Sequence, residues 1–93
     1  YAYLKRLPVD FIKIDGAFVR NITEDDVDYA LVKSITEMGH FLNKKIVAEF
    51  VSDDEILEVV KDIGVDYVQG FYLGKPVLIE DLGTSLRPAH EVA

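Results

Sequence analysis

Three polar side chains, Lys13, Glu49 and Gln69, each stand near the carboxyl end of a short and otherwise apolar run of residues. If these runs are strands of one parallel sheet, their carboxyl ends meet at one edge, where such sheets place their chemistry. An ammonium group beside a carboxylate in a partly dry site can hold and deprotonate a water molecule. The pattern is equally compatible with a structural ion pair between Lys13 and Glu49, and with an amide at Gln69 that only satisfies loop backbone groups.

The apolar runs have the composition of buried β-strands. They span residues 9–15, 46–51 and 65–70 and are rich in β-branched and aromatic residues. Side chains alternate between the two faces of a strand. This alternation predicts three groups on a common face: Phe11, Lys13 and Asp15; Val47, Glu49 and Val51; Tyr67 and Gln69.

The segment between the first two strands predicts a loop over residues 16–22 and then a helix. Thr23 is placed to cap this helix, and acidic residues in its first turn suit the positive end of the helix dipole. The apolar residues recur at helical spacing. They predict one apolar stripe made of Val27, Ala30, Leu31, Ile35, Met38 and Leu42.

A second helix is predicted after the second strand. Ser52 and Glu55 have the spacing of a capping box, and Gly64 is a typical C-terminal stop. After the third strand, residues 74–76 predict a turn, and a short helix is expected around residues 79–82.

Strand, helix, strand, helix and strand in succession predict an α/β fold with a parallel βαβαβ segment. A (β/α)₈ barrel uses about 31 residues for each of its eight units, so the chain corresponds to about three units of a TIM-like barrel. We expect residues 1–82 to form this part of a barrel and residues 83–93 to form a loosely ordered tail. Residues 1–7 resemble the last turns of a helix, which together with the open sheet edges favours a piece of a longer protein or self-association as a homodimer.

The composition excludes several classes of partner. Ten Lys and Arg against 17 Asp and Glu give a net charge of −7, which disfavours nucleic-acid polymers and anionic membranes. There is no Cys, so disulfides and thiolate metal sites are excluded, as is usual in a reducing cytoplasm. The charged residues are too evenly scattered to leave a membrane span. A cytoplasmic domain is therefore expected.

Three segments together resemble successive motifs of EAL domains, the bacterial cyclic di-GMP phosphodiesterases. They are FIKIDGAFVR at residues 11–20, VAEFV at 47–51 and VQGFYLGKP at 68–76. Their order and spacing both match, and three linked motifs are far more specific than one. The resemblance covers about residues 1–82.

This resemblance implies a barrel in which one or two Mg²⁺ or Mn²⁺ ions activate water to convert cyclic di-GMP to linear pGpG. Lys13 would position the water or a phosphate oxygen, and Glu49 would serve as general base or as a water-mediated metal ligand. Gln69 would be the active-site glutamine, which also binds substrate. Asp15 would be a metal ligand or would tie down the next loop. Phe50 would lie against a guanine base or pack against a neighbouring element.

The chain also departs from the family pattern. The Glu-Ala-Leu motif and most metal ligands belong upstream of Tyr1, so the chain is expected to be inactive without the N-terminal half of the barrel. Ser52 stands where the family usually has a second Glu, and Phe50 stands where a Gly is most familiar. The resemblance thus leaves open a degenerate domain that binds cyclic di-GMP or docks a partner without catalysis. A fused GGDEF or sensor domain upstream is common in the family.

Overall fold

The computed structural model of the chain describes residues 10–70 and 73–83. The helical turns predicted before Pro8 lie outside these residues, as does nearly all of the predicted tail. In the described part of the chain, no helix has the length and apolar character needed to cross a membrane.

The three predicted strands form a parallel sheet, which a fourth strand extends. The strands are β1 (Phe11–Ile14), β2 (Lys45–Val51), β3 (Tyr67–Gly70) and β4 (Leu73–Leu78), in the spatial order β1-β2-β3-β4. β1, β2 and β3 are parallel, whereas β4 returns antiparallel to β3. The turn predicted at residues 74–76 is therefore wrong. Pro76 lies in the last strand of the described sheet, where the lack of an N–H donor is tolerated.

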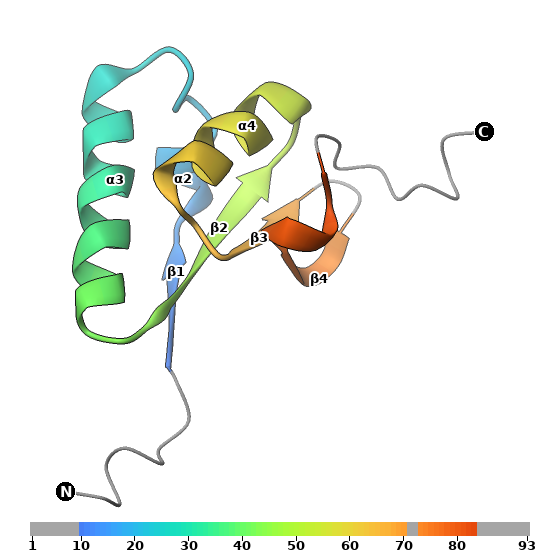
Figure 1. Cartoon of the computed structure of the whole chain (residues 1–93). Coiled ribbons are helices and arrows are strands. Elements are labelled where there is room, and N and C mark those ends of the chain that lie inside the picture. The colour runs from blue at the N-terminus through green and yellow to red at the C-terminus, as the bar shows by residue number, and fades with distance from the viewer. Residues whose placement is uncertain (1–9, 71–72, 84–93) are drawn as a thin grey trace, which may run out of the picture.

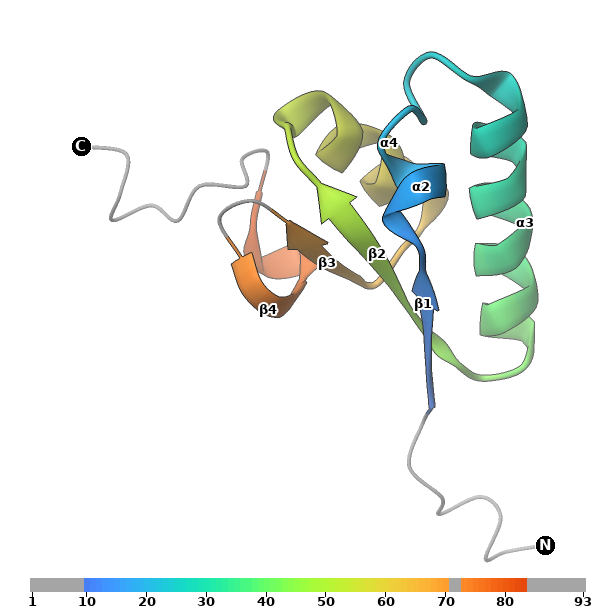
Figure 2. The same ribbon diagram turned by 180° about the vertical axis from the view of Figure 1, so that it is seen from behind.

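The helices are α2 (Gly16–Val19), α3 (Asp26–Phe41) and α4 (Asp54–Ile63), followed by the 3₁₀ turn η1 (Ile79–Asp81). The predicted loop over residues 16–22 thus contains one helical turn, α2. Helices α3 and α4 lie on one face of the sheet, and α2 lies just beyond the carboxyl end of β1 (Figure 1). The view from behind presents the opposite face, with β1, β2 and β3 in front (Figure 2).

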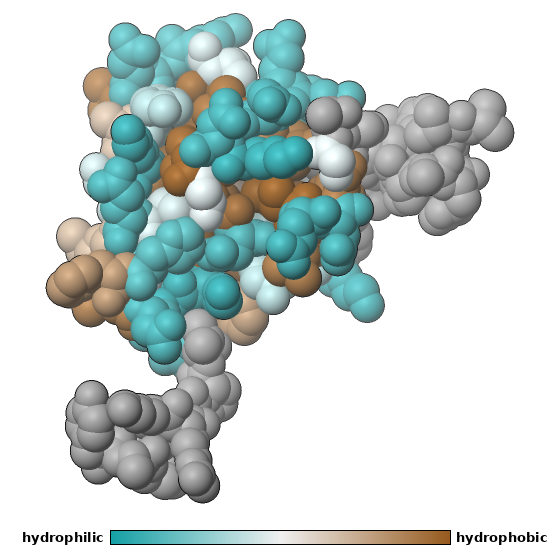
Figure 3. Space-filling view, viewed as in Figure 1, coloured by the Kyte–Doolittle hydropathy of each residue, from teal (hydrophilic) through white to brown (hydrophobic). Residues whose placement is uncertain are grey.

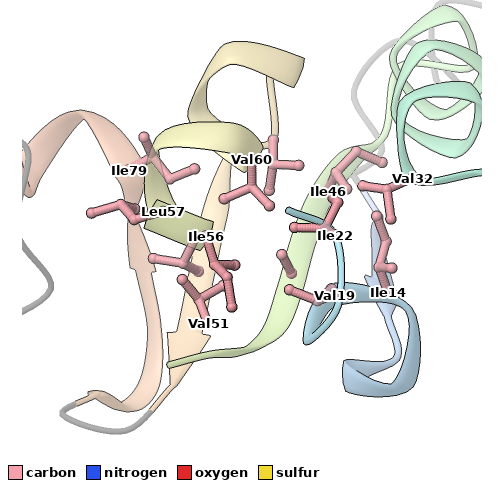
Figure 4. Close-up of a cluster of buried hydrophobic side chains, with 13 residues drawn as sticks. Ile14, Val19, Ile22, Val32, Ile46, Val51, Ile56, Leu57, Val60 and Ile79 are labelled. Carbon is pink, nitrogen blue, oxygen red and sulfur yellow. The ribbon is translucent and has the colours of Figure 1, made fainter. Parts of the chain in front are cut away.

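The core lies between the helices and the sheet (Figure 4). Ile14 and Ile46 from the strands meet Val32 of α3, while Val51 meets the buried side of α4. Each of the aliphatic side chains that line this layer is nearly inaccessible to solvent, and burial of one such side chain stabilises a fold by about 1.5–3 kcal/mol. The core therefore fixes the strands whose carboxyl ends carry the polar residues.

Helix α3 uses a different cap and a different face from those predicted. Its N-cap is Asp25, not Thr23, because the Asp25 carboxylate accepts hydrogen bonds from the backbone N–H groups of Val27 and Asp28 at 2.8 and 3.2 Å. The buried residues of the helix are Val32, Thr36 and Gly39.

The predicted apolar stripe of α3 is mostly exposed. Val27 and Met38 are 75% and 65% exposed, and hydrophobic surface gathers at the C-terminal end of α3 in Figure 3. The helix approaches the sheet through Gly39, where an added Cβ would lie 2.4 Å from Cδ1 of Ile46. The residues that α3 buries against the sheet are therefore of small or medium size. Of the predicted stripe, Ile35 packs against the core, whereas the other members are exposed.

Helix α4 follows the prediction closely, apart from its cap. Ile56 and Val60 are buried, and Gly64 ends the helix with φ of 104°, in the left-handed region that favours glycine. The N-cap is Asp53 rather than Ser52, since Oδ1 of Asp53 accepts the N–H of Ile56 at 2.8 Å. The capping box predicted from Ser52 and Glu55 is wrong by one residue.

This assignment predicts different effects for two adjacent substitutions. We expect Asp53→Ala to lower the free energy of unfolding by about 1 kcal/mol, because a helix N–H loses its acceptor. Ser52→Ala serves as the matched control and should change it by less than about 0.5 kcal/mol. Urea unfolding followed by far-UV circular dichroism measures both, and a larger effect at Ser52 would contradict the assigned cap.

Candidate functional site

The carboxyl edge of the sheet brings three of the predicted polar residues side by side. Ile14 is in register with Ala48, and Ala48 is in register with Val68. The next residue along each strand direction is polar: Asp15, Glu49 and Gln69. The parallel register therefore places two carboxylates and one amide at the same end of three neighbouring strands, as the sequence predicts for parallel pairing.

Lys13 lies one residue earlier, on the sheet face that the helices do not cover. It is in register with Val47, which in turn is in register with Tyr67. These three residues line a hollow of about 300 Å³ together with Phe11 and Pro76. The rings of Phe11 and Tyr67 meet edge to face, with centroids 5.4 Å apart. An exposed ammonium group thus stands at the border of a largely apolar surface.

Glu49 and Phe50 form a bulge in β2. Between the register pairs Ala48–Val68 and Val51–Gly70, these two residues of β2 oppose the single residue Gln69 of β3. A bulge of this kind re-aims a side chain and is common beside active sites. Glu49 is half-buried, whereas Phe50 is 59% exposed.

The bulge corrects one prediction about strand faces. Simple alternation places Val51 on the same face as Glu49, but Val51 is fully buried in the core beneath α4. The extra residue reverses the alternation after Glu49, so the carboxylate and the Val51 side chain separate.

Lys13 and Glu49, the charged residues considered for an ion pair at this edge, do not form one. Among residues 10–70 and 73–83, the ion pairs join His40 to Asp66 and Lys44 to Asp10, and none joins Lys13 to Glu49. The structural ion pair considered for Lys13 and Glu49 is therefore absent. Both groups remain available to a bound molecule.

Asp15 has a structural contact. Its Oδ1 accepts the backbone N–H of Ala17 at 2.8 Å and so caps α2. This is the loop-anchoring role that the sequence offered as one of two interpretations. Only Oδ1 takes part in that bond. The second carboxylate oxygen of Asp15 could therefore contact a ligand.

The residues of the described chain do not make a metal site by themselves. No group of three or more His, Cys, Asp or Glu side chains is gathered closely enough to hold a metal ion in the part of the chain that the structure describes. Mg²⁺ requires an octahedral set of oxygen ligands, of which Asp15 and Glu49 would supply two at most. The other ligands would be water molecules, substrate phosphate oxygens or residues beyond this set.

Two residues near the site, Gly16 and Arg20, were not singled out by sequence reasoning; both contact Phe50. The ring of Phe50 lies over Gly16, and the guanidinium carbon of Arg20 is 5.6 Å from the centroid of that ring. The ring thus packs on α2, as one of the two interpretations of Phe50 predicts. The available signal was a bulky residue at a position where a glycine is familiar.

Comparison with known proteins identifies the family. The sequence profile of the EAL domain matches residues 1–76. The chain belongs to the EAL domain family. The family resemblance stated from the three motifs is confirmed, and Lys13, Glu49 and Gln69 all lie within the matched range.

Named cyclic di-GMP phosphodiesterases align over most of the chain. It is 41% identical over 93 residues to the cyclic di-GMP phosphodiesterase PdeF of Escherichia coli K12, covering 100% of the chain and 12% of PdeF. It is 42% identical over 84 residues to the bifunctional diguanylate cyclase/cyclic di-GMP phosphodiesterase MucR of Pseudomonas aeruginosa, covering 90% of the chain and 12% of MucR. The chain thus spans about an eighth of the length of these relatives.

Solved EAL structures share the fold. A complex of the PaMucR phosphodiesterase with c-di-GMP superposes with a TM-score of 0.66 at 41% identity, covering 86% of the chain and 32% of that structure. The EAL enzyme Bd1971, bound to cAMP and cyclic di-GMP, gives a TM-score of 0.68 at 32% identity over 86% of the chain and 21% of that structure. The predicted fold class, a parallel α/β segment of a TIM-like barrel, is confirmed.

Proposed function

We propose that this EAL chain is the C-terminal part of a phosphodiesterase domain that hydrolyses cyclic di-GMP to linear pGpG. The observation that carries the proposal is the bulge in β2, which presents Glu49 between the strand of Lys13 and the residue Gln69. The named activities of PdeF and MucR support the same substrate.

Each polar residue of the edge has a role suited to its chemistry. Lys13 attracts a phosphate oxygen or the attacking water, since an ammonium group stabilises negative charge on a phosphodiester in a partly dry site. Glu49 accepts the proton of that water. Gln69 donates and accepts hydrogen bonds that orient the substrate.

The proposal assigns the remaining machinery to the rest of the barrel. Mg²⁺ or Mn²⁺, when bound by the complete domain, supplies water activation and phosphate neutralisation. Because the described residues hold too few ligands, the 93-residue chain alone is proposed to be inactive. The partner it requires is the N-terminal half of the barrel, and its place is the cytoplasm. A fused GGDEF domain, as the bifunctional name of MucR indicates for that protein, is compatible with this arrangement.

A chimera tests the proposal. The aligned 93 residues of PdeF are replaced by this chain, and conversion of cyclic di-GMP to pGpG is measured in Mg²⁺ and in Mn²⁺. We expect turnover. A folded chimera that binds no cyclic di-GMP would overturn the proposal.

Ser52 favours one alternative, a degenerate domain that binds cyclic di-GMP or a partner protein without hydrolysis. Its hydroxyl is exposed and does not cap α4, so the helix cap gives no reason for serine at this position. Binding of cyclic di-GMP by the chimera without turnover would support this alternative. Restoration of turnover by Ser52→Glu would then assign the defect to that residue.

A further inference from the structure

Phe50 has a backbone conformation that its side chain does not favour. Its φ is 58°, in the left-handed region, where a bulky residue is a true outlier. Strained conformations of this kind persist only when the surrounding structure holds them in place, and they gather at functional sites. Phe50 directly follows Glu49 within the bulge.

The surroundings that hold Phe50 belong to α2. An ideal Cβ built on Gly16 would lie 1.8 Å from Cδ2 of the Phe50 ring, so the ring occupies the space that any other residue at position 16 would fill. Gly16 is outside the left-handed region, since the positive-φ glycines are Gly64 and Gly83. The glycine is therefore required by the ring above it and not by its own backbone.

The far end of α2 contacts the same ring. Arg20 is the C-cap residue of α2, and its guanidinium carbon is 5.6 Å from the ring centroid, within the range of a cation–π contact. Asp15 caps the other end of α2. One aromatic ring thus bridges the bulge of β2 to the helical turn that follows β1.

The absence of a side chain at Gly16 leaves a space that the Phe50 ring fills, and we call this space the notch. We propose that Phe50 is a positioning residue: its ring, packed in the notch, holds Glu49 in place relative to β1. This contact is called the lock below. The inference rests on the proposed function of Glu49. With the ring seated, the bulge and α2 hold one relative position, so the carboxylate keeps its place relative to the strand that carries Lys13. Without the ring, the bulge is no longer held against α2, so the position of the Glu49 carboxylate changes although the residue itself does not.

The lock predicts that two different substitutions have the same effect. In the chimera, Phe50→Gly removes the ring, and Gly16→Ala fills the notch and displaces it. Each is expected to lower kcat about tenfold, since a displacement of 1 Å at a catalytic group can cost up to about a hundredfold. KM for cyclic di-GMP should stay within about twofold, because the ring positions Glu49 and does not hold the substrate.

The double variant shows whether the two substitutions disrupt one shared contact or lower kcat independently. Phe50→Gly with Gly16→Ala should show the same loss of about tenfold as either single variant, because the contact is already absent. Phe50→Tyr should retain the activity, since its ring fills the same notch. Phe41→Ala, which removes an aromatic side chain that is 89% exposed on α3, is the control and should leave kcat unchanged.

Two kinetic outcomes would overturn the inference. A product of the two losses in the double variant, about a hundredfold, would show that the residues act independently. A rise in KM with unchanged kcat in Phe50→Gly alone would mean that the ring contacts the nucleotide.

The urea midpoints of the four proteins of the cycle, the unsubstituted chimera and its three variants, give a measurement that does not depend on turnover. Gly16→Ala should lower the midpoint when Phe50 is present. In the Phe50→Gly background it should raise the midpoint slightly, because alanine favours the helical backbone of α2 more than glycine does. Equal shifts in both backgrounds would refute the notch contact. Absence of turnover in the unsubstituted chimera would count against the proposed function. The urea midpoints would still test the contact between Phe50 and Gly16.

Discussion

Glu49→Gln in the PdeF chimera is expected to lower kcat about 10³-fold while cyclic di-GMP still binds. The amide has almost the same shape as the carboxylate but does not accept a proton from water, and general base catalysis is worth about 10²–10⁴-fold. Steady-state formation of pGpG at saturating substrate gives kcat, and calorimetric titration gives the affinity. The half-buried position in the bulge, beside Gln69, is the structural reason for this expectation.

The control for this experiment is Glu58→Gln, which changes an exposed carboxylate of α4. It should leave kcat and the affinity unchanged. A loss of less than about tenfold in Glu49→Gln would contradict the role of Glu49 as the base.

Lys13→Met is expected to lower kcat/KM about 10²-fold. The substitution keeps most of the aliphatic stem that lines the hollow with Phe11 and Tyr67, and it removes only the positive charge. Loss of one preorganised group that stabilises developing charge costs about 10²–10³-fold in known enzymes. Initial rates at low cyclic di-GMP give kcat/KM directly.

Lys33→Met removes an exposed ammonium group of α3 and is the matched control. If both lysine variants lost activity equally, the effect would arise from the overall charge of the domain. If Lys13→Met had wild-type activity, Lys13 would have no part in the site.

The strands were predictable because their local composition agrees with their environment. β1, β2 and β3 lie within the apolar runs, apart from one added residue, Lys45, because runs rich in β-branched and aromatic residues favour strands. β4 was not predictable from its own residues. Gly74 and Pro76 are turn formers, and only pairing with β3 makes this segment a strand.

The helix errors have a physical cause in each case. Ser52 and Asp53 are both good N-caps, and the choice depends on which oxygen reaches the N–H of Ile56. In α3, two faces carry apolar residues, and periodicity alone does not say which of them contacts the sheet. The close approach at Gly39 decides it.

The sequence proposes members of the candidate site but does not specify their geometry. Lys13, Glu49 and Gln69 stand out as polar residues at the ends of apolar strands. The bulge depends on the register of β2 with β3, which no single segment specifies, so the reversal at Val51 was missed. The notch over Gly16 depends on the same bulge and was missed with it.

The most direct test of the account compares hydrolysis of cyclic di-GMP by the 93-residue chain alone with that by the chimera, in Mg²⁺ and in Mn²⁺. The account predicts pGpG from the chimera and none from the chain alone, because the described residues provide only part of a site. Glu49→Ala in the isolated chain controls for contaminating enzyme. Turnover by the isolated chain that disappears in Glu49→Ala would contradict the account, since it would require a complete site within these residues.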